Sequence, residues 1–261
     1  MRFSRFWLWR VPAGLALLAA ALFTAGFWLA MRSSTGSAIG SAPPAPAPRE
    51  ALKSPGKRLV LILGDSLSHG TGDPTGRGYA ADVAAALMRR GPVESVNLAV
   101  AGAESSDLRK LVESANVRSL AASADLILFS VGGNDLSHSL SGASAPAQAV
   151  SSVSASRARF AENLRSILQD LREANPSAPI RLLGLYQPFG GDGQESRIGE
   201  SLVLSWNSVL AETALGRANV VVVPVFDLFQ GRLDRLATDR FHPNRQGYRA
   251  IADRVIQTLT L

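Results

Sequence analysis

The chain has 261 residues, no cysteine and a formal net charge of +6. Without cysteine it can form no disulfide, thiolate metal site or cysteine nucleophile. Residues 1–56 carry six cations and one anion, which leaves 21 cations and 20 anions for residues 57–261. A nucleic-acid-binding domain normally presents a basic face, so the nearly neutral charge of this larger part argues against nucleic acid as a partner.

An uncharged stretch of 21 residues, 11–31, lies between Arg10 and Arg32. As a helix it would be about 31 Å long, which matches a bilayer core of about 30 Å. Tryptophans lie near both ends, and three arginines precede the stretch, which by the positive-inside rule places the N-terminus in the cytoplasm. We therefore expect residues 1–32 to be a transmembrane anchor that displays the rest of the chain outside the cytoplasmic membrane. A signal peptide cleaved near residues 38–40, with secretion of the remainder, is the alternative.

Residues 33–56 are rich in serine, glycine, alanine and proline. This composition cannot build a hydrophobic core and is typical of an extended tether. We expect a linker here, followed by one folded domain over residues 57–261.

Strand and helix patterns alternate from Lys57 onward. The expected strands are Leu59–Leu63, Val93–Leu98, Leu126–Val131, Ile180–Tyr186 and Val220–Val225. The expected helices are Tyr79–Arg90, Ser106–Ala122, Arg157–Ala174, Ile198–Leu215 and Gln246–Leu259. Five such units predict a three-layer α/β/α, flavodoxin-like sandwich with a mainly parallel five-stranded sheet of order 2-1-3-4-5. The serine- and alanine-rich stretch Ser137–Ser156 is expected to be a long loop, either a lid or a disordered segment.

Polar clusters follow the expected strands. Ser66 comes two residues after Gly64, which closes the first strand, and Asn134 follows the third strand. In a sheet of order 2-1-3-4-5 the switch point lies between strands 1 and 3, where open α/β sheets bind ligands. We therefore expect Ser66 and Asn134 to face each other across one crevice.

A serine hydroxyl is a weak nucleophile unless a base activates it. The chain offers three histidines, His69, His138 and His242. The first is expected to be an exposed loop residue, and the second falls in the serine- and alanine-rich stretch. His242 follows Asp239 by three residues, and an aspartate at this distance can fix the imidazole tautomer. Taken alone, the pair is more typical of a surface loop in which Asp239 caps the next helix.

An acyl-transfer site also needs hydrogen-bond donors for the developing oxyanion. The side-chain amide of Asn134 and the backbone N–H groups of Gly102 and Ser66 are candidates, although asparagine and glycine are also common in turns. Position 68 is serine, so the G-x-S-x-G nucleophile elbow is missing. There is no Walker A motif and no metal-ligand spacing, so we expect neither a cofactor nor a metal.

Together these clusters resemble the motif blocks of the SGNH, or GDSL, hydrolase family, in particular its bacterial lipase/acylhydrolase-like branch. The resemblance extends over residues 59–259. It rests on four blocks in order, Gly64-Asp65-Ser66-Leu67, Gly102, Gly132-x-Asn134-Asp135 and Asp239-x-x-His242.

The resemblance implies that Ser66 is the nucleophile, that His242 is the general base and then acid, and that Asp239 orients His242. It further implies an oxyanion hole made by the N–H groups of Ser66 and Gly102 and by the side chain of Asn134. We expect two further acids, Asp65 and Asp227, to be structural, and His69 departs from the family pattern.

The function implied is that of a serine esterase or acylhydrolase acting on lipid or other acyl esters. O-acetyl ester hydrolysis of carbohydrate or peptidoglycan and thioester hydrolysis are alternatives on the same site. A catalytically silent binding module and a flavodoxin-like cofactor or nucleotide binder are alternatives of another class. The membrane is an expected partner through the N-terminal helix.

Overall fold

The computed structural model describes residues 56–141, 145–188 and 193–259. The predicted anchor, residues 1–32, and all but the last residue of the predicted linker lie outside this range. Within the described residues, no helix combines the length and the apolarity that a membrane crossing requires.

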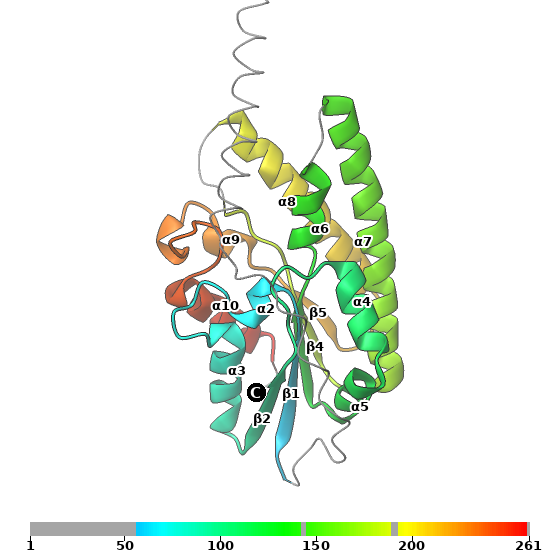
Figure 1. The fold of residues 1–261 in the computed structure, drawn as a ribbon. Helices are drawn as coiled ribbons and strands as arrows, with labels where there is room; N and C mark the ends of the chain where they lie inside the picture. Colours follow the sequence, from blue (N-terminus) through cyan, green and yellow to red (C-terminus); the bar gives the residue numbers. More distant parts are fainter. Residues whose placement is uncertain (1–55, 142–144, 189–192, 260–261) are drawn as a thin grey trace, which may run out of the picture. The chain divides into compact units, whose positions relative to one another are not determined.

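Five parallel strands form one sheet (Figure 1). They are β1 (Arg58–Gly64), β2 (Val93–Asn97), β3 (Leu126–Ser130), β4 (Ile180–Leu183) and β5 (Val220–Val223). Their order is β2-β1-β3-β4-β5, as the sequence predicts. Strand β3 is wholly buried and β1 is buried after its first residue, which explains why both read as continuous apolar runs.

Helices cover both faces of the sheet (Figure 1). One apolar cluster joins the sheet to α3 and α10, and the other joins it to α4, α5, α7 and α8. The helical elements are α2 (Ser66–His69), α3 (Gly78–Met88), α4 (Ser105–Glu113), α5 (Ala115–Ser123), α6 (Gly133–Leu140), α7 (Pro146–Ala174), α8 (Gln194–Ala214), α9 (Phe226–Phe229), the 3-10 turn η1 (Leu233–Arg235) and α10 (Arg245–Gln257). The predicted three-layer α/β/α class is confirmed.

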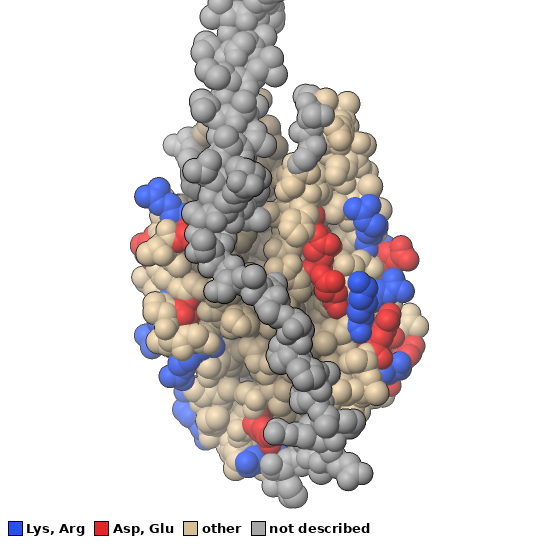
Figure 2. All heavy atoms as spheres, in the orientation of Figure 1, with Lys and Arg blue, Asp and Glu red and all other residues tan. Residues whose placement is uncertain are grey.

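Charged side chains of both signs share the surface of this domain. On the face drawn in Figure 2, lysines and arginines lie on both flanks together with aspartates and glutamates. The described residues on that face therefore form no single broad basic area.

The expected helix Ser106–Ala122 is wrong, because the structure has two helices there. The backbone becomes extended at Ser114, with φ −68° and ψ 140°, between α4 and α5. The Ser114 hydroxyl donates to the Leu111 carbonyl at 2.7 Å and accepts from the Val117 N–H at 3.4 Å. A serine can thus end one helix and cap the next inside a continuous apolar pattern.

The expected long loop Ser137–Ser156 is also wrong. Helix α6 continues to Leu140 and α7 begins at Pro146, so the link between them is short. Proline favours a first helical turn, and alanine-rich sequence favours helix even where apolar residues are few. The Ser156 hydroxyl is buried and donates to the Asp135 carbonyl at 3.0 Å, which ties this part of α7 to α6.

The end of β1 lies unusually close to β3. Gly64 pairs with Ser130 and has a φ of +112°. A Cβ atom at position 64 would lie 2.0 Å from the Ser130 carbonyl oxygen. Only glycine fits there, and the residues that follow it are therefore held against the end of β3.

We expect Gly64→Ala to reduce the free energy of unfolding by about 4 kcal/mol or more, because the strand pairing itself must shift. Gly76→Ala is the matched control, since its φ is +65° but its Cβ would meet nothing within 4 Å. That control should lose only about 1–2 kcal/mol, the cost of the left-handed backbone. Urea unfolding of both variants provides the comparison, and equal losses would contradict the role assigned to the close approach.

Candidate active site

Ser66 lies at the carboxyl end of β1, as the first residue of the short helix α2. The chain leaves β1 at Gly64, and Asp65 caps the helix by accepting the Leu67 N–H on its Oδ1 at 3.1 Å. The Ser66 side chain is half-buried. The expected position of this serine at the ligand-binding edge of the sheet is confirmed.

The structure brings Ser66, His242 and Asp239 together. His242 Nε2 lies 3.0 Å from Ser66 Oγ, and His242 Nδ1 lies 2.7 Å from Asp239 Oδ2. The other oxygen of Asp239 accepts the N–H groups of Phe241 at 2.9 Å and His242 at 3.0 Å. The three side chains form a continuous chain of contacts between the first and the last loops of the sheet edge.

Asp239 does not cap the following helix. That task falls to Asn244, whose Oδ1 accepts the N–H groups of Gln246 at 2.9 Å and Gly247 at 3.0 Å. The expectation that Asp239 caps the next helix is therefore wrong, because the aspartate contacts the histidine ring instead.

The electrostatics of the pair favour a charged aspartate. Partial burial acts to raise the pKa of Asp239, but the hydrogen bonds from the His242 ring and from two backbone N–H groups outweigh it and hold that pKa below its ordinary value. An ionised Asp239 can accept a hydrogen bond from an Nδ1–H group of His242.

The glycine-rich turn after α2 supports His242. A Cβ at Gly72 would lie 2.7 Å from the Cβ of His242 and from the Pro243 carbonyl oxygen. The Tyr248 hydroxyl donates to the Thr71 carbonyl at 2.7 Å, and this ties the turn to α10. The loops that carry the nucleophile and the histidine are therefore packed directly on each other.

Asp73 organises the same turn from inside. Its buried carboxylate accepts the Thr75 N–H and hydroxyl at 2.9 and 2.8 Å and the Gly78 N–H at 3.1 Å. Burial acts to raise the pKa of Asp73, but these hydrogen bonds and nearby Arg245 lower it overall. The carboxylate is thus a structural anion rather than a reacting group.

Asn134 and the turn at Gly102 also meet at this edge. Asn134 lies in the first turn of α6, and its Nδ2 donates to the Ala103 carbonyl at 2.8 Å. An amide nitrogen carries two hydrogens, and this contact uses one of them. Gly102 precedes Ala103 with a φ of +84°, and a Cβ there would meet nothing within 4 Å.

The other two histidines lie elsewhere. His69 ends α2 and its Nδ1 lies 3.3 Å from the Thr71 hydroxyl. His138 lies on α6 rather than in a loop, and its Nδ1 contacts Glu104 Oε1. Of the three histidines, all of them described, His242 is the one whose ring contacts Ser66.

Asp227 is structural, as expected. It forms a two-point ion pair with Arg254, with distances of 2.7 and 3.1 Å. The hydrogen bond from Arg254 holds the pKa of Asp227 below its ordinary value.

A buried hydroxyl network behind the nucleophile is not evident from the sequence. Ser130 Oγ lies 2.5 Å from Asp65 Oδ1 and 2.8 Å from Ser68 Oγ, which lies 2.9 Å from the Tyr79 hydroxyl. Burial raises the pKa of Asp65 and of Tyr79. The one available signal is Ser130 itself, a polar residue in the otherwise apolar strand β3.

The described residues contain no group of three His, Asp or Glu side chains arranged to hold a metal ion. The contacts at the sheet edge join a serine, a histidine and an aspartate, with an asparagine amide held beside the Gly102 turn.

Comparisons with known proteins identify the family of the chain. The model of the GDSL-like lipase/acylhydrolase family matches residues 62–250. The uncharacterized protein YpmR of Bacillus subtilis is 30% identical over 207 residues, which cover 77% of this chain and 81% of that protein.

Solved structures share the fold at lower identity. A lipase from a goat rumen metagenome has a TM-score of 0.69 at 23% identity, covering 76% of this chain and 96% of its own. Phospholipase A1 from Streptomyces albidoflavus has a TM-score of 0.61 at 20% identity, covering 78% and 100%. An acetylxylan esterase from Geobacillus stearothermophilus has a TM-score of 0.58 at 20% identity, covering 79% and 96%.

The burial of Asp65 predicts a pH-dependent stability. Because its pKa is raised on folding, the folded state holds the proton more tightly than the unfolded chain. The contribution of Asp65 to the free energy of unfolding is fully present below the ordinary aspartate pKa. It is lost as the pH rises through the pKa that Asp65 has in the folded protein. We therefore expect Asp65→Asn to gain about 1 kcal/mol or more relative to wild type between pH 3.5 and pH 7.

Urea unfolding of both proteins at the two pH values gives this difference. Asp227→Asn is the control of opposite sign, since the pKa of Asp227 is lowered. The free energy of unfolding of this variant should fall relative to that of wild type between pH 3.5 and pH 7. The prediction would be contradicted if the free energy of unfolding of D65N also fell relative to that of wild type between pH 3.5 and pH 7.

Proposed function

The chain belongs to the GDSL-like lipase/acylhydrolase family and is a carboxylic ester hydrolase, and on this premise we propose that Ser66 is its nucleophile, activated by His242 and Asp239. The observation that carries the proposal is the unbroken contact chain from Asp239 Oδ2 through the His242 ring to Ser66 Oγ, at 2.7 and 3.0 Å. Both distances are within hydrogen-bond range for a nucleophile, its base and the residue that orients the base.

The reaction proceeds in two acyl-transfer steps. Ser66 Oγ attacks the ester carbonyl while His242 Nε2 takes the hydroxyl proton, and Asp239 stabilises the imidazolium. Collapse of the tetrahedral intermediate breaks the ester C–O bond, and His242 returns the proton to the leaving alcohol. Water then attacks the acyl-enzyme with His242 again as base, and this releases the acid and free Ser66.

The oxyanion of each intermediate is held by the N–H groups of Ser66 and Gly102 and by the amide of Asn134. The contact between Asn134 and the Ala103 carbonyl supports this assignment, because it sets the amide beside the Gly102 turn. Donors fixed before the reaction stabilise the developing charge without reorganisation.

The substrate we propose is an ester with an apolar acyl chain. The Phe241 ring lies edge-on to the His242 ring, with centroids 5.0 Å apart, and Phe241 is 36% exposed. Val100, two residues before Gly102, is 55% exposed. The Phe241 ring thus offers an apolar contact beside His242, as an acyl chain requires. Acetyl esters of carbohydrate and thioesters are the alternatives, and a panel of substrates distinguishes them.

We expect Ser66→Ala to reduce hydrolysis of p-nitrophenyl butyrate by about 10⁴-fold or more, since the nucleophile is removed. A fluorophosphonate probe should label the wild type and not this variant. Ser151→Ala, at an exposed serine of α7, is the control and should keep both activity and labelling. Wild-type rates in the Ser66→Ala protein would reject the assignment, and a wild-type protein that neither labels nor turns over would indicate a silent binding module.

We also propose that residues 11–31 anchor the enzyme in the cytoplasmic membrane with the catalytic domain outside. The support is the length, apolarity and flanking arginines of this segment. In bacterial spheroplasts, we expect external protease to degrade the catalytic domain and alkaline carbonate to leave the full chain in the membrane. Protection from protease would reject the orientation, and release of a shortened chain into the medium would indicate signal-peptide cleavage.

A further inference from the structure

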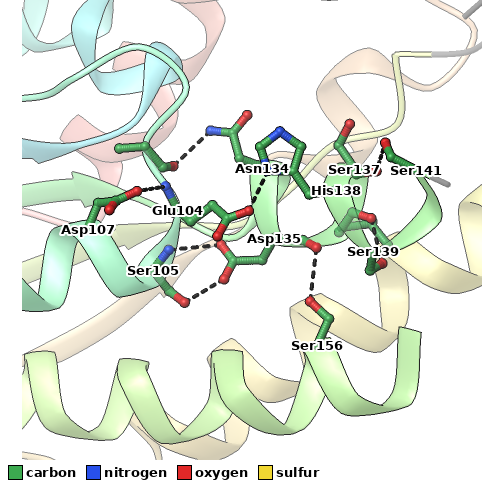
Figure 3. Close-up of polar contacts among 12 residues, drawn as sticks. Glu104, Ser105, Asp107, Asn134, Asp135, Ser137, His138, Ser139, Ser141 and Ser156 are labelled. Carbon is green, nitrogen blue, oxygen red and sulfur yellow. Dashed lines mark hydrogen bonds and ion pairs between the residues drawn. The ribbon is translucent and has the colours of Figure 1, made fainter. Parts of the chain in front are cut away.

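Three consecutive residues after Gly102 each contact a different side chain of α6. Figure 3 shows this row of contacts from the side of α6. The pairs are Ala103 with Asn134, Glu104 with His138, and Ser105 with Asp135. The row fastens the Gly102 turn and the start of α4 to the helix that carries Asn134.

At the inner end of the row, Ser105 and Asp135 are buried and hydrogen-bonded to each other. Asp135 accepts the Ser105 N–H at 3.0 Å and the Ser105 hydroxyl at 2.5 Å. The Asn163 amide of α7 donates to the same hydroxyl at 3.0 Å. This end anchors α4 but lies three residues beyond Gly102, so it does not by itself fix the turn.

The outer end of the row is the contact between His138 Nδ1 and Glu104 Oε1. These side chains are 52% and 34% exposed. His138 follows Asn134 by four residues, which places both on one face of α6. Glu104 is two residues from Gly102, and its own N–H donates to Asp107 Oδ2 at 3.1 Å. The contact therefore joins the segment after Gly102 to the helix face of Asn134, on the exposed side of the Ala103–Asn134 hydrogen bond.

We propose that His138 is a positioning residue that, through Glu104, holds the Gly102 turn in register with Asn134. The inference rests on the proposed oxyanion hole and gives His138 no role in proton transfer. Donors must lie close to the position of the oxyanion to stabilise it. Without this contact the turn samples positions in which the Gly102 N–H points away from the oxyanion, and turnover falls in proportion.

The size of the effect follows from the exposure of the pair. Exposed ion pairs add little to global stability, so the contact biases the turn by a few-fold rather than by orders of magnitude. The loss should therefore appear in kcat, with KM and the thermal midpoint almost unchanged. A purely structural role would instead lower the thermal midpoint and leave kcat at low temperature intact.

The test uses the full-length protein in detergent with p-nitrophenyl butyrate. We expect His138→Ala and His138→Leu to lower kcat about 3–5-fold with KM within twofold of wild type. His138→Asn should keep kcat, because asparagine Nδ2 is as many bonds from Cα as histidine Nδ1 and can donate to Glu104. Glu104→Ala should match His138→Ala, and the double variant should be no slower than either single variant.

Arg118→Ala is the matched control. It breaks the Arg118–Glu173 ion pair, which is similarly exposed at 46% and 51% but joins α5 to α7, and kcat should not change. The inference would be overturned if His138→Ala kept the wild-type kcat or changed only KM. It would also be overturned if His138→Asn did not restore kcat, or if the losses of the two single variants multiplied in the double variant.

Ser66→Ala and Asn134→Ala in the same series separate this inference from the proposed function. Loss of activity in both, with His138→Ala at wild-type kcat, overturns the positioning role alone. Retained activity in Ser66→Ala or Asn134→Ala overturns the proposed site and this inference with it.

Discussion

The close pairing of β1 with β3 is the constraint on which the active edge depends. Gly64 has no side chain, so its backbone approaches the Ser130 carbonyl more closely than any other residue would allow. This brings Asp65 to the Ser130 hydroxyl and starts α2 with Ser66 at the sheet edge. The strand that follows in space, β3, leads into α6 and sets Asn134 beside the same edge. Ser66 and Asn134 are thus positioned by one strand pair.

The base reaches this edge from the far end of the chain. His242 and Ser66 are 176 residues apart, and the contact between them depends on the packing of the loop before α10 against the glycine-rich turn. Gly72 lets the His242 Cβ and the Pro243 carbonyl approach, and the Tyr248 hydroxyl of α10 donates to the Thr71 carbonyl. Two sets of elements, one on β1 and β3 and one on α10, therefore meet where the glycine-rich turn packs against the loop before α10.

The sequence predicts the strand order and the three contacting side chains because both follow from local signals. Buried parallel strands give apolar runs, and Ser66 and His242 stand in short motifs at strand or helix ends. The helix break at Ser114 and the start of α7 were mispredicted, since capping and alanine-rich sequence carry little apolar periodicity. The hydroxyl network of Ser130, Ser68 and Tyr79 depends on contacts between residues far apart in sequence, which no local pattern encodes.

The order of the parts along the chain has a consequence for biosynthesis. A nascent polypeptide presents Ser66 long before the loop with Asp239 and His242, which precedes α10, the helix that packs against α3. A chain interrupted before His242 therefore holds Ser66 without the ring that contacts it, and under the proposed mechanism it has no acyl-transfer activity.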